Sequence, residues 1–143
     1  MAEELNKAWL AGFFDGEGSV GFTNANRTDT KWMNIRVSLT QKDELDLLNE
    51  VKAYYGGSVS PHSKRNGTYQ WNLSAADGVA KFLEDVLPFI RLERKRERAT
   101  IILAIAKLIR DNDFRCSFGK LMLKDPAAAE QRADLEDAFE RLQ

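Results

Sequence analysis

The sequence predicts an α+β domain with a four-stranded antiparallel sheet that carries helices on one face. Two pairs of short segments alternate apolar and polar residues, as half-buried strands do. Each pair follows a segment whose apolar residues recur at helical spacing. The order is helix, hairpin, helix, hairpin, helix, then C-terminal helices. Since every strand has one polar face, we expect helices on the other face only, which leaves an open polar face for function.

The first helix is expected over residues 3–14, where apolar side chains recur every three or four positions. Glycines stand on both sides of Glu17, and glycine is a poor helix former. The helix is therefore expected to end at about Asp15 and Gly16.

The first hairpin is expected to join residues 19–25 and 32–40 through a polar turn. Alternation assigns one face of these strands to the core: Val20, Phe22, Met33, Ile35, Val37 and Leu39. The outward positions are Ser19, Gly21, Thr23, Trp32, Asn34, Arg36, Ser38 and Thr40, with Arg27 in the turn.

The second half repeats this order with different residues. A helix over 42–55 is closed by two glycines, and a hairpin of residues 58–62 and 68–74 follows it. Its core-facing residues are Tyr69, Trp71 and Leu73. Its outward residues are Ser60, His62, Lys64, Arg65, Thr68, Gln70 and Asn72. A helix over 75–87 is then stopped by a proline, and its apolar stripe is expected in the core: Phe82, Leu83, Val86 and Phe89.

The C-terminal part begins with a basic run at 91–98 that leads into an apolar helix, and the tail predicts a last helix. No linker, low-complexity segment or fixed repeat divides the chain. We therefore expect one domain over 1–143, with a core of about 3–112 and a helical extension of about 113–143.

The composition excludes several classes of protein. Among 143 residues the single Cys116 cannot form an internal disulfide, and no apolar run approaches the roughly 20 residues that span a bilayer. The start, MAEELNK, has no secretory pattern. We therefore expect an intracellular, non-secreted protein without a membrane role. With one histidine, His62, a histidine metal cluster or a Ser-His-Asp triad has little support, and Cys116 has no partner for zinc.

The chemistry is concentrated in residues 9–22, WLAGFFDGEGSVGF. Ala11 and Gly12 are small enough for two helix backbones to approach closely, and Asp15 and Glu17 end the helix. On these residues alone, a solvated helix end is the more common interpretation. However, the helix dipole opposes carboxylates at a C-terminus, which favours a compensating cation such as a divalent metal.

Residues 10–18, LAGFFDGEG, resemble the signature of the LAGLIDADG homing endonucleases. The element order over about 3–112 resembles that family's αββαββα fold, which has a saddle-shaped sheet. The resemblance implies a site-specific double-strand DNA endonuclease of intron homing that depends on Mg²⁺, with Mn²⁺ or Ca²⁺ substituting in binding. Because the chain has one motif, it also implies a C2 homodimer through the helix of residues 3–15. The implied interface residues are Trp9, Ala11, Gly12 and Asp15.

The resemblance assigns a metal-binding role to Glu17 together with the Gly16 carbonyl. The family usually has Asp at this position, and Glu keeps the charge on a longer arm. Gln41 matches a strand-end glutamine that supports the metal and its water. A polar residue starting the next helix explains Gln41 equally well from the sequence.

The resemblance also implies an active-site lysine in the basic run. Lys95 is the best match, although its spacing from Pro88 is about two residues long compared with the family pattern. Arg94 and Arg96 are rivals, and a solvated or phosphate-contacting charge run is the alternative. The implied catalytic set is Glu17, Gln41 and Lys95.

The outward residues of the two hairpins are the implied DNA face, which would enter the major groove. The set is Ser19, Gly21, Thr23, Arg27, Trp32, Asn34, Arg36, Ser38, Ser60, His62, Lys64, Arg65, Thr68, Gln70 and Asn72. The net charge of −1 alone argues against a polyanion as partner, but the charge is segregated. Residues 18–41 and 56–74 together hold five basic residues against one acidic, whereas 125–143 holds six acidic against two basic. The acidic helices are therefore expected away from the duplex.

Two other functions compete with the enzyme. A cleavage-inactive protein of the same fold could act as an RNA maturase or a DNA-binding regulator. However, a pure binder has no physical need for a carboxylate beside phosphate. A helical interaction module built on 93–143 would explain the acidic tail but not the carboxylates framed by glycines.

Overall fold

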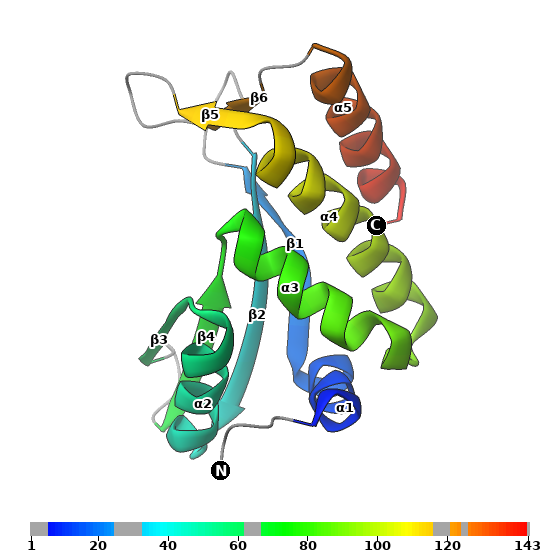
Figure 1. Ribbon diagram of the computed structural model, residues 1–143. Coiled ribbons are helices and arrows are strands. Elements are labelled where there is room, and N and C mark those ends of the chain that lie inside the picture. The colour runs from blue at the N-terminus through cyan, green and yellow to red at the C-terminus, as the bar shows by residue number, and fades with distance from the viewer. Residues whose placement is uncertain (1–5, 25–32, 62–66, 116–120, 124–125, 143) are drawn as a thin grey trace.

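The computed structural model describes the chain except residues 1–5, 25–32, 62–66, 116–120, 124–125 and 143 (Figure 1). The elements are α1 (Lys7–Glu17), β1 (Gly18–Asn24), β2 (Met33–Lys42), α2 (Leu45–Tyr55), β3 (Ser58–Pro61), β4 (Thr68–Leu73), α3 (Ala76–Val86), the 3₁₀ turn η1 (Leu87–Phe89), α4 (Glu93–Asn112), β5 (Asp113–Arg115), β6 (Leu121–Leu123) and α5 (Pro126–Arg141). None of the helices in the described part combines the length and apolar character needed to cross a membrane.

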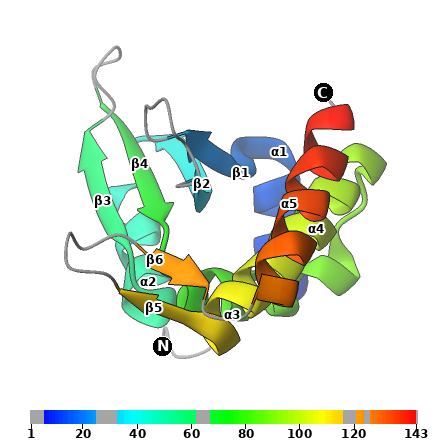
Figure 2. The same cartoon turned by 90° about the horizontal axis from the view of Figure 1, so that it is seen from above.

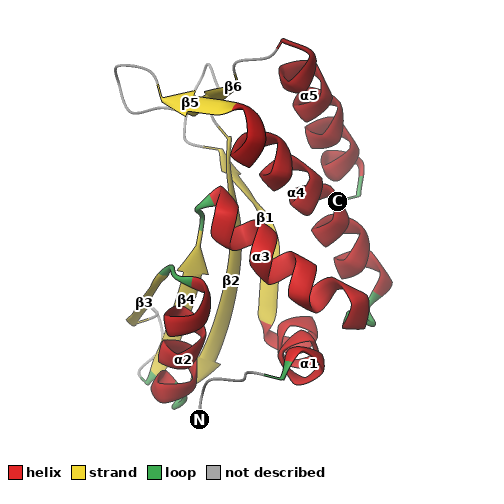
Figure 3. Ribbon diagram, in the orientation of Figure 1, coloured by secondary structure: helices red, strands yellow, loops and turns green. Residues whose placement is uncertain are grey.

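The sheet confirms the predicted α+β architecture. Its four strands are antiparallel in the order β1-β2-β4-β3, so the second strand of each hairpin lies at the centre. Figure 1 shows α2 and α3 in front of the sheet, and in the turned view of Figure 2 they again lie on one side of it. Figure 3 shows that the three strands β1, β2 and β4 run behind these helices.

The core lies between the sheet and these helices. Ile35, Val37 and Leu39 of β2 are buried, which confirms the predicted alternation. The indole of Trp71 on β4 is fully buried, and its Nε1 donates to the Gly56 carbonyl oxygen at 2.7 Å. Its ring lies 5.3 Å from that of Phe82 on α3. The aromatic side chains thus join the central strand β4 to the helical layer.

The prediction that the apolar stripe at the end of α3 is buried is wrong at one position. Phe89 is 44% exposed, whereas Phe82, Leu83 and Val86 are buried. The helix α3 stops at Val86 and the chain continues as η1, so Phe89 leaves the helical face that points into the core.

The first helix extends further than its glycines predict. It continues through Gly16 to Glu17, and the backbone N–H of Gly18 still donates to the Phe14 carbonyl oxygen. The ammonium of Lys95 accounts for this, because it donates to carbonyls of the last turn. A tertiary contact therefore offsets the poor helix propensity of Gly16.

The C-terminal part differs most from expectation. Residues 93–98 of the basic run form the start of α4, a single helix of 20 residues. The strands β5 and β6 form a hairpin that the sequence pattern does not predict. The last helix, α5, packs on α4 and buries Phe139. A Cβ at Gly21 on β1 would lie 3.5 Å from the Phe139 ring, so α5 also reaches the first strand.

The outer helices are joined by a hydrogen bond whose loss we expect to be measurable. The Tyr55 hydroxyl donates to Asp85 Oδ2 at 2.7 Å, and burial raises the pKa of Tyr55 above its ordinary value. Tyr55→Phe removes the donor and is expected to lower the free energy of unfolding by about 1 kcal/mol. Urea unfolding measures this loss. Tyr54→Phe is the matched control, because the Tyr54 side chain is 38% exposed and its hydroxyl has no hydrogen bond among the described residues. Equal losses for both variants would contradict the assignment.

Candidate active site

The two carboxylates at the end of α1 have different surroundings. Asp15 Oδ2 accepts a hydrogen bond from the backbone N–H of Arg91 at 2.8 Å, and its Oδ1 is buried without a described partner. Glu17 is exposed and makes no hydrogen bond with the described residues. Gly16 beside it is exposed as well. Asp15 is therefore tied to the protein, whereas Glu17 is available to a ligand.

Lys95, in the first turns of α4, lies against the same helix end. Its Nζ donates to the carbonyl oxygens of Phe14 at 2.9 Å, Asp15 at 2.8 Å and Gly18 at 2.8 Å. Burial lowers the pKa of Lys95, the charge of Arg98 lowers it further, and the charges of Asp15 and Glu17 oppose this shift. One ammonium thus binds three acceptors at the negative end of the α1 dipole.

This ammonium alters the argument for a metal. The dipole at the end of α1 favours a compensating cation, and Lys95 already supplies one. In the described part of the chain, no group of three or more His, Cys, Asp or Glu side chains is placed to hold a metal ion. The exposed Glu17 carboxylate and its exposed neighbour Gly16 offer oxygen donors of the kind that Mg²⁺ prefers, but too few for a complete site. The donors of one chain fit part of a metal site that other ligands would complete.

The neighbouring arginines are engaged to different degrees. Arg94 Nη1 donates to the Leu142 carbonyl oxygen at 2.9 Å. Arg96 donates to the Ile90 carbonyl oxygen from Nε at 3.2 Å and from Nη2 at 3.0 Å. Arg98 is half-buried, and its Nε is buried without a described acceptor. Sequence reasoning named Arg94 and Arg96 as rivals of Lys95 and missed Arg98.

Gln41 lies on β2 and not at the start of a helix, so the helix-start interpretation is wrong. Its Oε1 accepts a hydrogen bond from the backbone N–H of Lys42 at 3.0 Å. Since Gly18 pairs with Leu39, β2 continues past the beginning of β1 on the side where α1 ends. The described contacts do not join Gln41 to Glu17.

The polar face of the sheet is cross-linked by side-chain hydrogen bonds. Ser19 and Ser38 share a hydrogen bond of 2.7 Å between β1 and β2. Gln70 Nε2 donates to Thr40 Oγ1 at 3.2 Å, and Asn72 Nδ2 donates to Gln70 Oε1 at 3.2 Å. These bonds orient amide and hydroxyl groups across the three neighbouring strands, as a surface for base-edge recognition requires.

The structure places only part of the expected DNA-face residues at the surface. The residues of this set that are exposed or half-exposed are Ser19, Arg36, Ser60, Gln70 and Asn72. Ser38 and Thr68 are only 3% and 4% exposed, so the expectation that they are accessible is wrong. Both are small and have side chains of neighbouring strands beside them. Gly21 faces Phe139 of α5. Arg27, Trp32, His62, Lys64 and Arg65 lie outside the described residues, and for Thr23 and Asn34 only the backbone is described.

Two residues that were not in the expected DNA-face set also lie on this polar face, although alternation already placed Thr40 outward. Thr40 on β2 is half-exposed and bonded to Gln70, and Ser58 on β3 is exposed and pairs with Asn72. Their place in the alternating pattern was the signal that identifies them.

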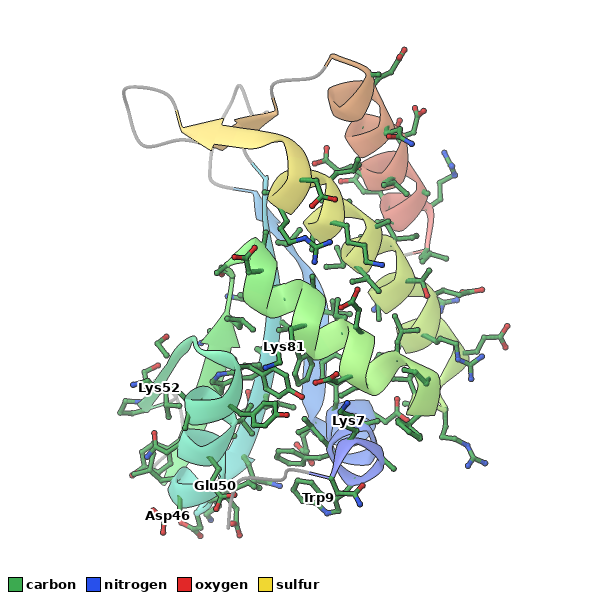
Figure 4. All side chains as sticks on the ribbon, viewed as in Figure 1. Lys7, Trp9, Asp46, Glu50, Lys52 and Lys81 are labelled. Carbon is green, nitrogen blue, oxygen red and sulfur yellow. The ribbon has the colours of Figure 1, made fainter. Side chains whose placement is uncertain are left out.

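One face of α1 is open to solvent. Trp9 is 49% exposed and stacks on Phe13 at 5.5 Å, and Figure 4 shows Trp9 on the side of α1 away from α3. A Cβ at Gly12 or Gly16 would meet no atom within 4 Å. These residues are spaced at three, four and seven positions, so they form one exposed stripe.

The expected interface is wrong at one residue. Ala11 is 0% exposed because it faces the core of its own chain. Asp15 is half-buried and held by Arg91, and only Trp9 and Gly12 of the expected set lie openly on the stripe.

A sequence model of the LAGLIDADG endonuclease family matches residues 10–92. The probable intron-encoded endonuclease aI2 of Debaryomyces hansenii is 25% identical over 91 residues, which are 55% of this chain and 14% of that protein. The DNA endonuclease I-CvuI of Chlorella vulgaris is 28% identical over 141 residues, which are 94% of this chain and 78% of that protein.

Solved structures with this fold confirm the architecture. The homing endonuclease I-CvuI, in complex with the I-CreI target and Mg, superimposes with a TM-score of 0.69 at 23% identity, over 95% of this chain and 80% of that one. The archaeal intron-encoded homing endonuclease I-Vdi141I, complexed with DNA, has a TM-score of 0.68 at 14% identity, over 96% of this chain and 83% of that one.

Proposed function

The chain belongs to the LAGLIDADG endonuclease family, and on this premise we propose that it is a homing endonuclease that cuts both strands of a long, pseudo-palindromic DNA target as a homodimer. The observation that carries the proposal is Glu17, an exposed carboxylate at the end of the motif helix that makes no hydrogen bond with the described residues. Such a group beside phosphate repels it unless a cation lies between them. The names of the relatives, which are endonucleases, support the same activity.

The polar face of the sheet is the proposed DNA-binding surface. A two-stranded ribbon or sheet fits the major groove of B-DNA, where each base pair presents a distinct pattern of donors and acceptors. Arg36 is suited to guanine, and the amides of Gln70 and Asn72 are suited to adenine. The DNA complexes of similarly folded proteins support this orientation.

A divalent cation is part of the proposal, with Mg²⁺ for cleavage and Mn²⁺ or Ca²⁺ substituting in binding. Glu17 and the Gly16 carbonyl would hold it together with DNA phosphates. When bound, the ion polarises the phosphate and lowers the pKa of an attacking water. Glu17 acts as a ligand and not as a general base, and Gln41 positions water. Structures of I-CvuI described with Mg and with Ca support a divalent metal.

The homodimer follows from the same site. Each chain offers one exposed Glu17. If two chains pair through the exposed stripe of α1 about a two-fold axis, the Glu17 of the second chain would lie near that of the first. Gly12 and Gly16 allow the two helix backbones to approach closely, and Trp9 and Phe13 supply apolar area.

The test separates binding from cutting. A library of random duplexes is first selected by binding to the protein in Ca²⁺, and the selected duplexes are then incubated with and without Mg²⁺. We expect a cut in both strands at one position, only with Mg²⁺. Selective binding without any metal-dependent cut would overturn the enzyme and support a DNA-binding regulator. A parallel selection on structured RNA tests the maturase.

The orientation of the sheet yields a separate prediction. Arg36→Ala, on the polar face of β2, is expected to weaken target binding by about 1–3 kcal/mol and to relax selectivity at one base pair. Lys52→Ala on α2 is the control, since Lys52 lies on the helical side in Figure 4. Fluorescence anisotropy with the selected duplex measures both affinities. A larger loss for Lys52→Ala would place DNA on the opposite face.

A further inference from the structure

We infer that Gln70 is the amide on the polar face that reads a base of the target, and that Thr40 and Asn72 are positioning residues that hold this amide in one orientation. The inference rests on the proposed function and deepens it, because it names the side chain that selects a base and the two that sharpen the selection.

The three side chains form a continuous chain of hydrogen bonds. Thr40 on β2 lies directly opposite Gln70 on β4, and Asn72 is the next residue of β4 on the same face. Gln70 Nε2 donates to Thr40 Oγ1 at 3.2 Å, and Gln70 Oε1 accepts from Asn72 Nδ2 at 3.2 Å. The nitrogen end of the Gln70 amide therefore faces β2, and its oxygen end faces Asn72.

These bonds leave Gln70 with the groups that a base contact needs. A primary amide has two N–H donors and two lone pairs on its oxygen. Gln70 uses one donor and one lone pair within the protein, so one of each remains. Adenine presents the matching pair in the major groove, with N7 as acceptor and the N6 amino group as donor. Gln70 is only half-buried and lies on the face proposed for DNA.

Asn72 does not keep such a pair available. Its Oδ1 is buried without a hydrogen-bond partner among the described residues, and one of its N–H donors is bound to Gln70. A buried oxygen can accept from a base only if the side chain turns, and turning would break the bond to Gln70. The amide of Asn72 has the chemistry that suits adenine, but its surroundings suit it to hold Gln70.

The orientation matters because a half turn of a glutamine amide exchanges its donor and its acceptor. A free amide can therefore match more than one arrangement of base atoms. In the reverse orientation, the NH₂ group of Gln70 would face the NH₂ group of Asn72, and the bond between them would be lost. The Thr40 hydroxyl can donate as well as accept, so Thr40 holds the amide in place while Asn72 sets its direction.

The first experiment measures base preference by binding alone. Duplexes are selected from a random library in Ca²⁺ with the wild type and with each variant, and Gln70→Ala identifies the base pair at which preference is lost. There the wild type should prefer one base about 5- to 150-fold. Thr40→Val removes the hydroxyl and nearly keeps the shape, and it should lower this preference about 2- to 12-fold, the effect of one hydrogen bond. Thr40→Ser restores the hydroxyl and should retain the preference.

Asn72→Asp tests the direction of the amide. The carboxylate replaces the donor of Asn72 by an acceptor of nearly the same size, so Gln70 should turn its Nε2 toward this position and its oxygen toward the Thr40 hydroxyl. We expect the preference at the Gln70 base pair to change to another base. Asn72→Ala offers neither group and should only relax the preference.

Thr100→Val on α4 is the matched control. It makes the same substitution at an exposed position, where the hydroxyl donates to the Arg96 carbonyl oxygen of its own helix. This variant should change neither the affinity nor any base preference.

A second measurement needs no DNA. The exchange of side-chain amide protons with water is followed by NMR for Gln70 and for Gln131, which is exposed on α5. The Gln70 protons should exchange about 2- to 12-fold more slowly in the wild type, and Thr40→Val should bring their rate close to that of Gln131. Thr100→Val should leave both rates unchanged.

The inference is overturned if Thr40→Val leaves the preference and the exchange rate of Gln70 unchanged, or if Thr40→Ser loses the preference as Thr40→Val does. It is also overturned if Asn72→Asp does not change the preferred base. Loss of preference at a second base pair in Asn72→Ala would show that Asn72 reads a base itself.

These outcomes differ from failure of the proposed function, in which the wild type binds its duplex selectively without cutting it. In that case the base preferences still decide the roles of the three residues. A wild type without any base preference overturns this inference together with the proposed recognition of a specific target.

Discussion

Glu17→Gln is expected to abolish cleavage of the selected duplex and to leave the affinity for that duplex unchanged or higher. The amide keeps the size of the side chain but removes the negative charge that would hold the metal. Losing this charge stabilisation should lower the single-turnover rate by at least about 10²–10³-fold. The affinity should not fall, because a negative charge near phosphate is removed.

The matched control is Glu50→Gln on α2, an exposed carboxylate on the helical side of the sheet. Cleavage rates and anisotropy titrations are measured for wild type and both variants under the same salt. Glu50→Gln should change neither quantity. If Glu17→Gln retained the wild-type rate, or lost affinity together with rate, Glu17 would not be the metal ligand.

Gly12→Leu is expected to abolish the homodimer and with it cleavage, while the single chain becomes slightly more stable. A Cβ at Gly12 meets no atom within 4 Å, so the larger side chain is accommodated in one protomer. Leucine is also a better helix former than glycine, by less than about 1 kcal/mol. In a dimer, however, it would stand between two helix backbones that must approach closely.

Sedimentation measures the dimer, and urea unfolding at low concentration measures the protomer. We expect the dimer dissociation constant to rise at least about 100-fold, the counterpart of roughly 2.7 kcal/mol. Ala53→Leu on α2 is the control, since it adds the same bulk at an exposed position of another helix. A dimeric, active Gly12→Leu protein would rule out pairing through this stripe. A wild type that stays monomeric on DNA would rule out the shared site itself.

The periodicity of the sequence was sufficient for the elements with strong local patterns. The alternation of Ile35, Val37 and Leu39 identifies both the strand β2 and its buried face. The hairpin of β5 and β6 was missed because its three-residue strands are too short for alternation to be recognised. The extent of α1 was missed because the residue that holds its end, Lys95, is some 80 positions away in the chain.

The same limit applies to the candidate site. Alternation shows on which face Ser38 and Thr68 lie, but their burial depends on neighbouring side chains that only the sheet register brings together. Ala11 and Gly12 were expected together because both are small, but neighbours on a helix point in different directions, and Ala11 lies on the buried face with Leu10 and Phe14. The basic run predicts positive charge at this place in the chain. Which of its side chains donates to which backbone carbonyl depends on tertiary contacts that the sequence does not show.

Because each chain supplies only one exposed Glu17 at the end of α1, the activity would depend steeply on how much of the chain is made. If a complete site needs two chains, the amount of active enzyme below the dimer dissociation constant grows with the square of the chain concentration. A tenfold drop in expression would then lower the number of complete sites about a hundredfold. An endonuclease that works only as a dimer would thereby be nearly silent when it is scarce, without any separate inhibitor.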